Sequence, residues 1–168
     1  MSTLRSRPAL LALALIVQLG LVGVAVDGQL SARFTGEEYT LRVRPVDPID
    51  PFRGAYVDLG YPDLAGAGAD GILTTDDIRR SREDGDRVFV PLVRDGDVWV
   101  GRQATLVRPD DSPYLRCTER SWRVRCGIES WFLPQDEALA LEEKLAQGDV
   151  LATIRVDSRG NAALVDVG

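Results

Sequence analysis

The stretch Arg87–Gly101, RVFVPLVRDGDVWVG, decides the fold class. Two runs rich in Val, Phe, Leu and Trp flank the dipeptide Asp95–Gly96. An Asp-Gly pair between two such runs favours the tight type I′ turn of a β-hairpin. The second run continues to Pro109, so we expect an antiparallel hairpin over residues 87–109 that turns at Asp95–Gly96.

A second hairpin is expected over residues 114–128, YLRCTERSWRVRCGI. A turn centred on Ser121–Trp122 places Cys117 opposite Cys126, where a disulfide could join them if their Cα atoms lie about 5.5 Å apart. A redox pair is the alternative, but reactive cysteines favour a CxxC spacing at a helix start, and eight residues separate these two. We therefore expect a structural disulfide, which would stabilise the fold by ~2–3 kcal/mol at most.

The C-terminal part predicts a helix followed by another hairpin. The stretch PQDEALALEEKLAQG (134–148) has acids near its start and Gly148 at its end, as helices prefer. Its inward face would carry Leu139, Leu141 and Leu145. The runs DVLATIRV and AALVDVG flank the turn sequence DSRGN (157–161), which predicts a final hairpin over 149–168.

Upstream, alternating residues predict two half-buried strands. Residues 38–46 alternate and would place Tyr39, Leu41 and Val43 on one face. Residues 55–61, AYVDLGY, alternate in the same way after a Pro-rich turn. A short helix is expected over 74–84, TTDDIRRSRED. Residues 35–168 thus predict a mostly β, antiparallel domain of about seven strands and one or two short helices.

The N-terminus predicts a transmembrane anchor. Pro8–Val26 contains no charged residue, and its 19 residues would form a helix of about 28 Å, close to the ~30 Å hydrocarbon core of a bilayer. Arg5 and Arg7 precede the stretch and Asp27 follows it, so the positive-inside rule places the N-terminus in the cytoplasm. We expect residues 1–34 to form a cytoplasmic tip, an anchor in the lipid bilayer through residues 8–26, and a short stalk.

Two alternatives to an uncleaved anchor stay open. A cleaved signal peptide is one, although the apolar run exceeds the usual 7–15 residues of such segments. A helix buried in a soluble core is the other. With a cleaved peptide or an anchor, the residues after Asp27 lie outside the cytoplasm, where disulfides persist.

Composition excludes several classes of function. The chain has 168 residues and a formal net charge of −6, with 19 Arg and a single Lys. An acidic chain lacks the basic surface that a general nucleic-acid binder needs. The absence of His excludes His-based triads and His metal ligands, and two Cys are too few for a structural zinc site. We therefore expect no metal and no cofactor.

A cluster of arginines on the second hairpin is the first candidate site. Arg116, Arg120, Arg123 and Arg125 cluster around Glu119 and could bind phosphate, carboxylate or anionic lipid headgroups. The alternative is a solvated strand face that pairs with acids elsewhere in the protein.

Glu129 is the second candidate, because its neighbours are Ile128, Trp131 and Phe132. A carboxylic acid in such an apolar setting could stay protonated and act as a general acid, with Asp58 as partner. The alternative is an ion pair between Glu129 and an arginine of the hairpin.

A Ser–Lys hydrolase needs a separate argument, because an anchor followed by an exported β-domain also describes type I signal peptidases. Their chemistry requires a desolvated Lys as the base for Ser. Lys144, the single Lys, follows two Glu on the expected amphipathic helix and would be solvated. We assign no catalytic residue.

Two segments resemble the GDYXXLXY family of bacterial membrane-anchored proteins. Residues 46–61, VDPIDPFRGAYVDLGY, are similar to the family signature, with matches at Gly54, Tyr56, Leu59 and Tyr61 and with Ala55 in place of Asp. Residues 125–143 are similar to a second family segment. Its matches are Gly127, Ile128, Glu129, Phe132 and Pro134, with Cys126 where Tyr is usual.

The resemblance implies a protein without an established activity that is often encoded beside polytopic membrane proteins. Ala55 argues against a catalytic carboxylate at that position. The residues that could bind a ligand are Arg53, Gly54, Tyr56, Asp58, Tyr61 and Glu129. Our main hypothesis is a non-catalytic accessory or interaction protein for an integral membrane partner. The alternative is a ligand-binding domain or hydrolase-like enzyme that uses Glu129 and the Tyr56/Tyr61 strand.

Overall fold

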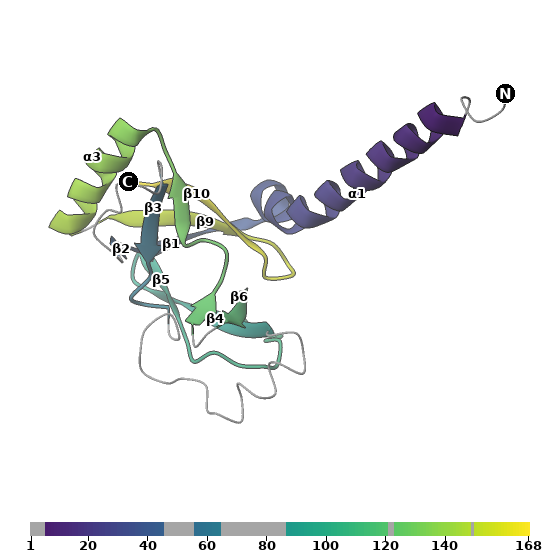
Figure 1. Ribbon diagram of the computed structural model, residues 1–168. Coiled ribbons are helices and arrows are strands. Elements are labelled where there is room, and N and C mark those ends of the chain that lie inside the picture. Colours follow the sequence, from purple (N-terminus) through teal and green to yellow (C-terminus); the bar gives the residue numbers. More distant parts are fainter. Residues whose placement is uncertain (1–5, 46–55, 65–86, 121–122, 149) are drawn as a thin grey trace.

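A long helix projects from a β-rich domain in the computed structural model (Figure 1). The structure describes residues 6–45, 56–64, 87–120, 123–148 and 150–168. Arg53, Gly54, Ala55 and the predicted helix at 74–84 lie outside these residues.

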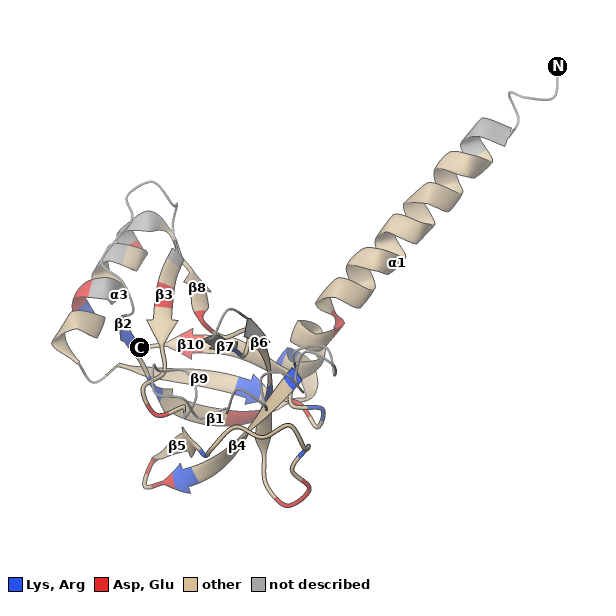
Figure 2. Ribbon diagram, turned by 60° about the horizontal axis from the view of Figure 1, so that its bottom comes forward, with Lys and Arg blue, Asp and Glu red and all other residues tan. Residues whose placement is uncertain are grey.

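The helix α1, Ser6–Thr35, is long and apolar enough to span a membrane. Its most apolar window of 18 residues has a mean hydropathy of 2.6, and the rest of the chain covers none of that window. Figure 2 shows most of the projecting part of α1 without Lys, Arg, Asp or Glu, and residues 8–26 of the sequence contain none of these four residue types. The helix continues past Gly28 for about two turns and ends at Thr35, one residue before Gly36.

Ten strands and a second helix follow α1 in the described residues, rather than the seven strands expected. They are β1 (Glu37–Arg42), β2 (Arg44–Pro45), β3 (Tyr56–Gly60), β4 (Arg87–Asp95), β5 (Val98–Gly101), β6 (Tyr114–Arg120), β7 (Arg123–Arg125), β8 (Ser130–Phe132), α3 (Gln135–Gln147), β9 (Leu151–Val156) and β10 (Ala162–Val167). The predicted strand over 38–46 is divided into β1 and β2, and β8 lies where no strand was predicted; β2 and β8 are too short to show an alternating pattern.

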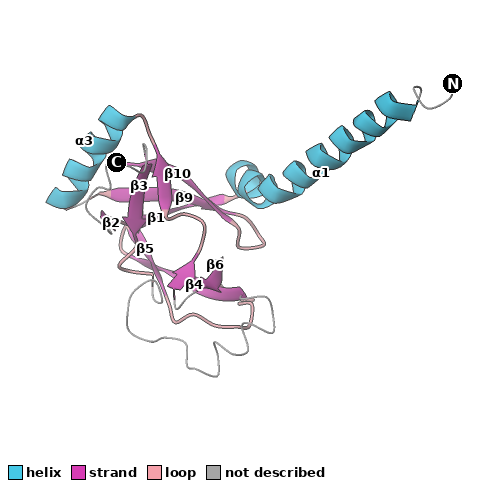
Figure 3. Ribbon diagram, in the orientation of Figure 1, coloured by secondary structure: helices cyan, strands magenta, loops and turns pink. Residues whose placement is uncertain are grey.

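The strands form three antiparallel sheets in the orders β1-β9-β10, β2-β3-β8 and β5-β4-β6-β7 (Figure 3). Backbone hydrogen bonds tie the sheets together: Gly101 N–H donates to Asp63 O, and Arg116 N–H donates to Gly160 O. The three sheets share one hydrophobic core. Its largest fully buried side chains are Leu41, Leu59, Leu92, Leu115, Ile128 and Ile154.

The predicted hairpins are present, with one shift. In the β4–β5 hairpin Asp95 pairs with Val98, so the two loop residues are Gly96 and Asp97, not Asp95 and Gly96. Gly96 takes a φ of +65°, and this puts the glycine at the first loop position, where a positive φ is needed. The final hairpin turns over residues 157–161 as expected.

The predicted burial of the strands and of α3 is also confirmed. Tyr39, Leu41 and Val43 are buried, and so are Val57 and Leu59. On α3, Ala138, Leu141 and Leu145 face the core, and Gly148 ends the helix with a φ of +87°. The side chain of Leu139 is outside the described part of the structure.

Candidate functional site

The two segments that resemble the family signature pair with each other. β3 and β8 are antiparallel, with Tyr56 opposite Phe132 and Asp58 opposite Ser130. Leu59 N–H extends the ladder to Glu129 O at 2.8 Å. The structure therefore brings Glu129 beside the signature strand. The side chain of Tyr56 lies outside the described residues.

Tyr61 is held inside this junction. Its side chain is buried, and its hydroxyl donates a 2.7 Å hydrogen bond to Ile128 O. Burial raises the pKa of Tyr61 far above the ordinary value of a phenol, and the negative charge of Glu129 raises it further. Tyr61 therefore stays protonated and acts as a hydrogen-bond donor at this position.

The Glu129 carboxylate binds backbone groups of the preceding turn. It accepts hydrogen bonds from Cys126 N–H and from Gly127 N–H, the latter at 3.0 Å. Arg116 and Arg125 are the two hairpin arginines whose side chains are described, and neither forms the expected ion pair with Glu129. Glu129 thus holds the turn that leads into β8.

The predicted carboxylate partner, Asp58, is exposed and accepts a 3.3 Å hydrogen bond from Ser130 Oγ. Glu129 and Asp58 therefore occupy neighbouring positions of the β3–β8 pair with different partners. Together, Tyr61, Glu129 and the paired strands form what we call the signature junction.

The predicted disulfide between Cys117 and Cys126 is present, with a Cα–Cα distance of 4.1 Å. It links β6 to the turn that Glu129 holds, so the second hairpin is fastened to the signature junction. Of the predicted arginine cluster, Arg116 and Arg125 are exposed. The side chains of Glu119, Arg120 and Arg123 lie outside the described residues.

A second polar junction, absent from our sequence-based predictions, joins α1 to the β9–β10 turn. Asp157 lies at its centre and is only 6% exposed. Its carboxylate accepts hydrogen bonds from Ser31 Oγ at 2.6 Å, from Asn161 Nδ2 at 2.8 Å, and from the backbone N–H groups of Arg159 and Asn161 at 2.9 Å. We call this the anchor junction.

These hydrogen bonds decide the charge state of Asp157. Burial alone would raise its pKa, but the hydrogen bonds from Ser31, Asn161 and Arg159 outweigh burial and lower the pKa to about 2. The carboxylate is therefore ionised at neutral pH. The local half of this arrangement could have been read from DSRGN, since Asp often bonds to backbone N–H groups that follow it in a turn.

Further contacts fix the last turns of α1 on the domain. Arg159 Nη2 lies 3.0 Å from Asp27 Oδ2. Arg155 donates to Arg33 O at 2.9 Å and forms an ion pair with Glu38 at 2.7 Å. A single residue, Gly36, separates α1 from β1.

Only glycine fits at position 36. A Cβ there would overlap Ala32 O and lie 2.8 Å from Val156 N. The end of α1 is therefore packed directly against the backbone of β9.

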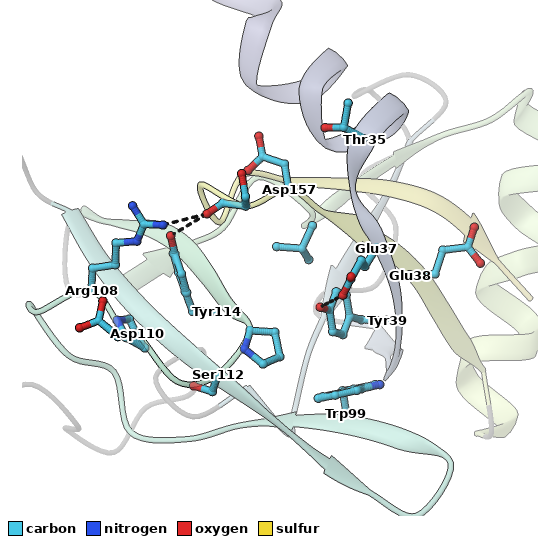
Figure 4. A pocket seen from close by; sticks show the side chains of 14 residues that line it. Thr35, Glu37, Glu38, Tyr39, Trp99, Arg108, Asp110, Ser112, Tyr114 and Asp157 are labelled. Carbon is cyan, nitrogen blue, oxygen red and sulfur yellow. Dashed lines mark hydrogen bonds between the residues drawn. The ribbon is translucent and has the colours of Figure 1, made fainter.

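A cleft of about 620 Å³ opens beside the anchor junction (Figure 4). Tyr39 and Trp99 line one side, in edge-to-face contact with ring centroids 4.9 Å apart. Arg108 and Tyr114 line the other side, and both donate hydrogen bonds to Ser158 O, at 3.0 and 3.1 Å.

Tyr39 is held as a donor in this cleft. Its hydroxyl donates a 3.0 Å hydrogen bond to Glu37. Burial, followed by the hydrogen bond to Glu37 and the charge of Glu37, raises the pKa of Tyr39 to about 12. The cleft thus combines aromatic surface with one cationic group and several acids.

A smaller cleft of about 370 Å³ lies near Arg42, Asp63 and Leu151. Of the described residues, neither Tyr61 nor Glu129 lines either of these two clefts. Within the described ranges, no group of three or more His, Cys, Asp or Glu side chains is placed to hold a metal ion.

The sequence model of the GDYXXLXY protein family matches residues 18–167. The chain belongs to the GDYXXLXY family. The match covers the second half of α1, both junctions and the whole β-domain, so the predicted family is confirmed. No curated protein and no solved structure matches the chain.

Proposed function

We propose that this GDYXXLXY protein is anchored in a bacterial cell membrane by α1, with its N-terminus in the cytoplasm and its β-domain outside, as a non-catalytic accessory or interaction protein for an integral membrane partner. The apolar length of α1 supports the anchor. Arg5 and Arg7 before the apolar stretch and Asp27 after it support the orientation. The disulfide supports a location outside the reducing cytoplasm.

The observation that carries the non-catalytic role is the internal use of the signature residues. The Tyr61 hydroxyl is bonded to Ile128 O, and the Glu129 carboxylate is bonded to backbone N–H groups. A general acid or a ligand-binding group must present its polar atom to a substrate. Groups bonded inside the chain instead support a scaffold that holds a surface in place.

The test is site-directed photocrosslinking in cells. A photoreactive residue is placed in turn at each position from 9 to 26 of α1, where Gly20 and Gly23 have open space around them. If a membrane protein is bound to one face of α1, crosslinked adducts of one discrete mass should form at positions spaced three to four residues apart along the helix. Mass spectrometry should identify the crosslinked partner as a polytopic protein. Adducts with lipid alone, at every position equally, would contradict the proposal.

The orientation is tested separately by thiol labelling of intact cells. Reduction should free the partly exposed Cys126 thiol for a membrane-impermeant maleimide without permeabilisation, whereas Cys117 is buried. Labelling that requires permeabilised membranes would place the domain in the cytoplasm.

The cleft between Tyr39 and Arg108 favours a second candidate function, the binding of a small cationic ligand, because four carboxylates and one guanidinium line it beside the aromatic rings. Its volume of about 620 Å³ falls in the usual range of ligand sites, roughly 300–1,000 Å³. A site formed by Tyr56, Tyr61 and Glu129 has less support, because two of these three residues are bonded internally.

This second function is tested by NMR titration with a panel of small amines and quaternary ammonium ions. Binding should shift the signals of Tyr39 and Trp99. Asp110→Asn, in the cleft lining, should weaken the binding several-fold, whereas Asp97→Asn, at an exposed position outside the cleft lining, should leave it unchanged. Equal effects of the two substitutions would reject the cleft as the site.

A further inference from the structure

The face of α1 that is turned away from the domain carries an exposed apolar stripe along its last turns, from Val26 to Phe34. Val26, Leu30 and Phe34 are 40%, 47% and 77% exposed. Their spacing of four residues places them along one side of the helix. Ser31 and Ala32 contact the domain instead, since Ser31 bonds to Asp157 and Ala32 is fully buried.

The length of the helix indicates what covers this stripe. The 27 residues Ala9–Thr35 correspond to about 40 Å, which is roughly 10 Å more than the hydrocarbon core of a bilayer. With the uncharged part of α1 in that core, the two turns that follow Val26 fall in the headgroup layer of the outer leaflet. The stripe continues the lipid-facing surface of the span without a break.

The charges at this level complement a lipid surface. Arg159 is ion-paired with Asp27 at the start of these two turns, and Gln29 Nε2 reaches Gly127 O at 3.4 Å. These contacts hold the β9–β10 turn and the segment after β7 at the level of the first turn of α1 outside the membrane. Arg125, which is exposed and lies two residues before Gly127, is therefore at this level as well. The guanidinium group of Arg125 at this level suits a lipid phosphate, whereas that of Arg159 is paired with Asp27 and Asp157.

We propose that the stripe formed by Val26, Leu30 and Phe34 lies in the headgroup layer of the outer leaflet, so that the domain sits directly on the bilayer. Apolar side chains such as Leu and Phe on one face of an interfacial helix are commonly buried ~5–10 Å into this region. The proposal rests on the proposed membrane anchoring and adds where the domain sits.

The test measures the depth of position 34 in vesicles. The full-length Phe34→Cys variant, with the Cys117–Cys126 disulfide kept oxidised, is labelled with a fluorophore and reconstituted in equal parts of phosphatidylcholine and phosphatidylglycerol. Phe34 is exposed, so its replacement leaves the core intact. A lipid with a nitroxide at the headgroup should quench this label several-fold more than a label on Asp97→Cys, in the exposed β4–β5 turn.

Three results would overturn the proposal. Equal quenching at positions 34 and 97, in protein that floats with the vesicles, would place the stripe away from the bilayer while leaving the anchor intact. A crosslink between two copies through position 34 would show that a second copy covers the stripe. Protein that does not float with vesicles would reject the anchor itself, and this inference with it.

Discussion

The signature junction and the anchor junction both join distant segments of the chain, but only the signature junction lies in segments that stand out in the sequence. Each joins segments that are far apart in the chain, 67 residues for Tyr61 and Ile128 and 126 residues for Ser31 and Asp157. The signature junction lies in segments dense with Gly, Pro and aromatic residues. The anchor junction uses ordinary Ser, Asp and Asn side chains. Motif density therefore marks demanding backbone geometry, and it gives no sign of a junction whose central carboxylate is only 6% exposed.

The largest expected effect is at the anchor junction. Asp157→Ala would leave the Ser31 hydroxyl, the Asn161 amide and two backbone N–H groups without their acceptor. We expect the free energy of unfolding to fall by ~3 kcal/mol, measured by urea denaturation of the full chain in detergent micelles. Asp97→Ala, in an exposed turn, is the control and should change it by less than ~0.5 kcal/mol. Equal effects of the two substitutions would contradict the central role of Asp157.

The second prediction concerns pH. Asp157 has a folded pKa of about 2 against an ordinary value of 3.8, so its ionised form stabilises the folded state. This contribution is fully present above about pH 4 and is lost as the pH falls toward 2, with a total of roughly 2 kcal/mol. Asp157→Asn should flatten this part of the pH dependence of unfolding. An unchanged profile would place the acid-sensitive group elsewhere.

A smaller effect is expected from the carboxylate of the signature junction. Glu129→Gln keeps the size of the side chain but weakens its hydrogen bonds to Cys126 N–H and Gly127 N–H. Because Glu129 is only half-buried, we expect a loss of ~1–1.5 kcal/mol in the same denaturation assay. Glu137→Gln, at an exposed position of α3, is the matched control. A loss as large as that of Asp157→Ala would show that the two junctions contribute equally to the free energy of unfolding.

The smallest effects compare two tyrosines, one at each junction. Tyr61→Phe removes the buried hydrogen bond to Ile128 O and should cost ~1 kcal/mol. Tyr114→Phe removes a part-buried hydrogen bond to Ser158 O beside the anchor junction and should cost about half as much. Both losses are measured by thermal unfolding. A larger loss of stability for Tyr114→Phe than for Tyr61→Phe would show that burial of the hydroxyl does not determine the loss.

Local patterns predicted most of the fold. The alternation of Val57 and Leu59, the turn at 157–161 and the pairing of Cys117 with Cys126 all follow from residues close together in sequence. The turn of the first hairpin was wrong by one residue, because Asp-Gly and Gly-Asp both occur in RDGD and the positive φ at Gly96 decides between them.

The sites were harder to predict, because their partners are distant or lie on the backbone. Nothing around Ser31 or Asp27 indicates a partner in the last dozen residues of the chain. The turn that Glu129 holds offers backbone N–H groups, which any sequence supplies. Sequence therefore identified Glu129 and Tyr61 as important residues but did not identify what they bind.

The single residue between α1 and β1 has a mechanical consequence. Gly36 leaves no length of chain in which a change of angle between the helix and the β-domain could be absorbed. Transmembrane helices commonly tilt by ~20° from the bilayer normal, and they tilt further in thinner membranes. With α1 anchored as we propose, such a tilt would turn the whole β-domain together with the helix, and local membrane thickness would set the direction in which its outer surface points.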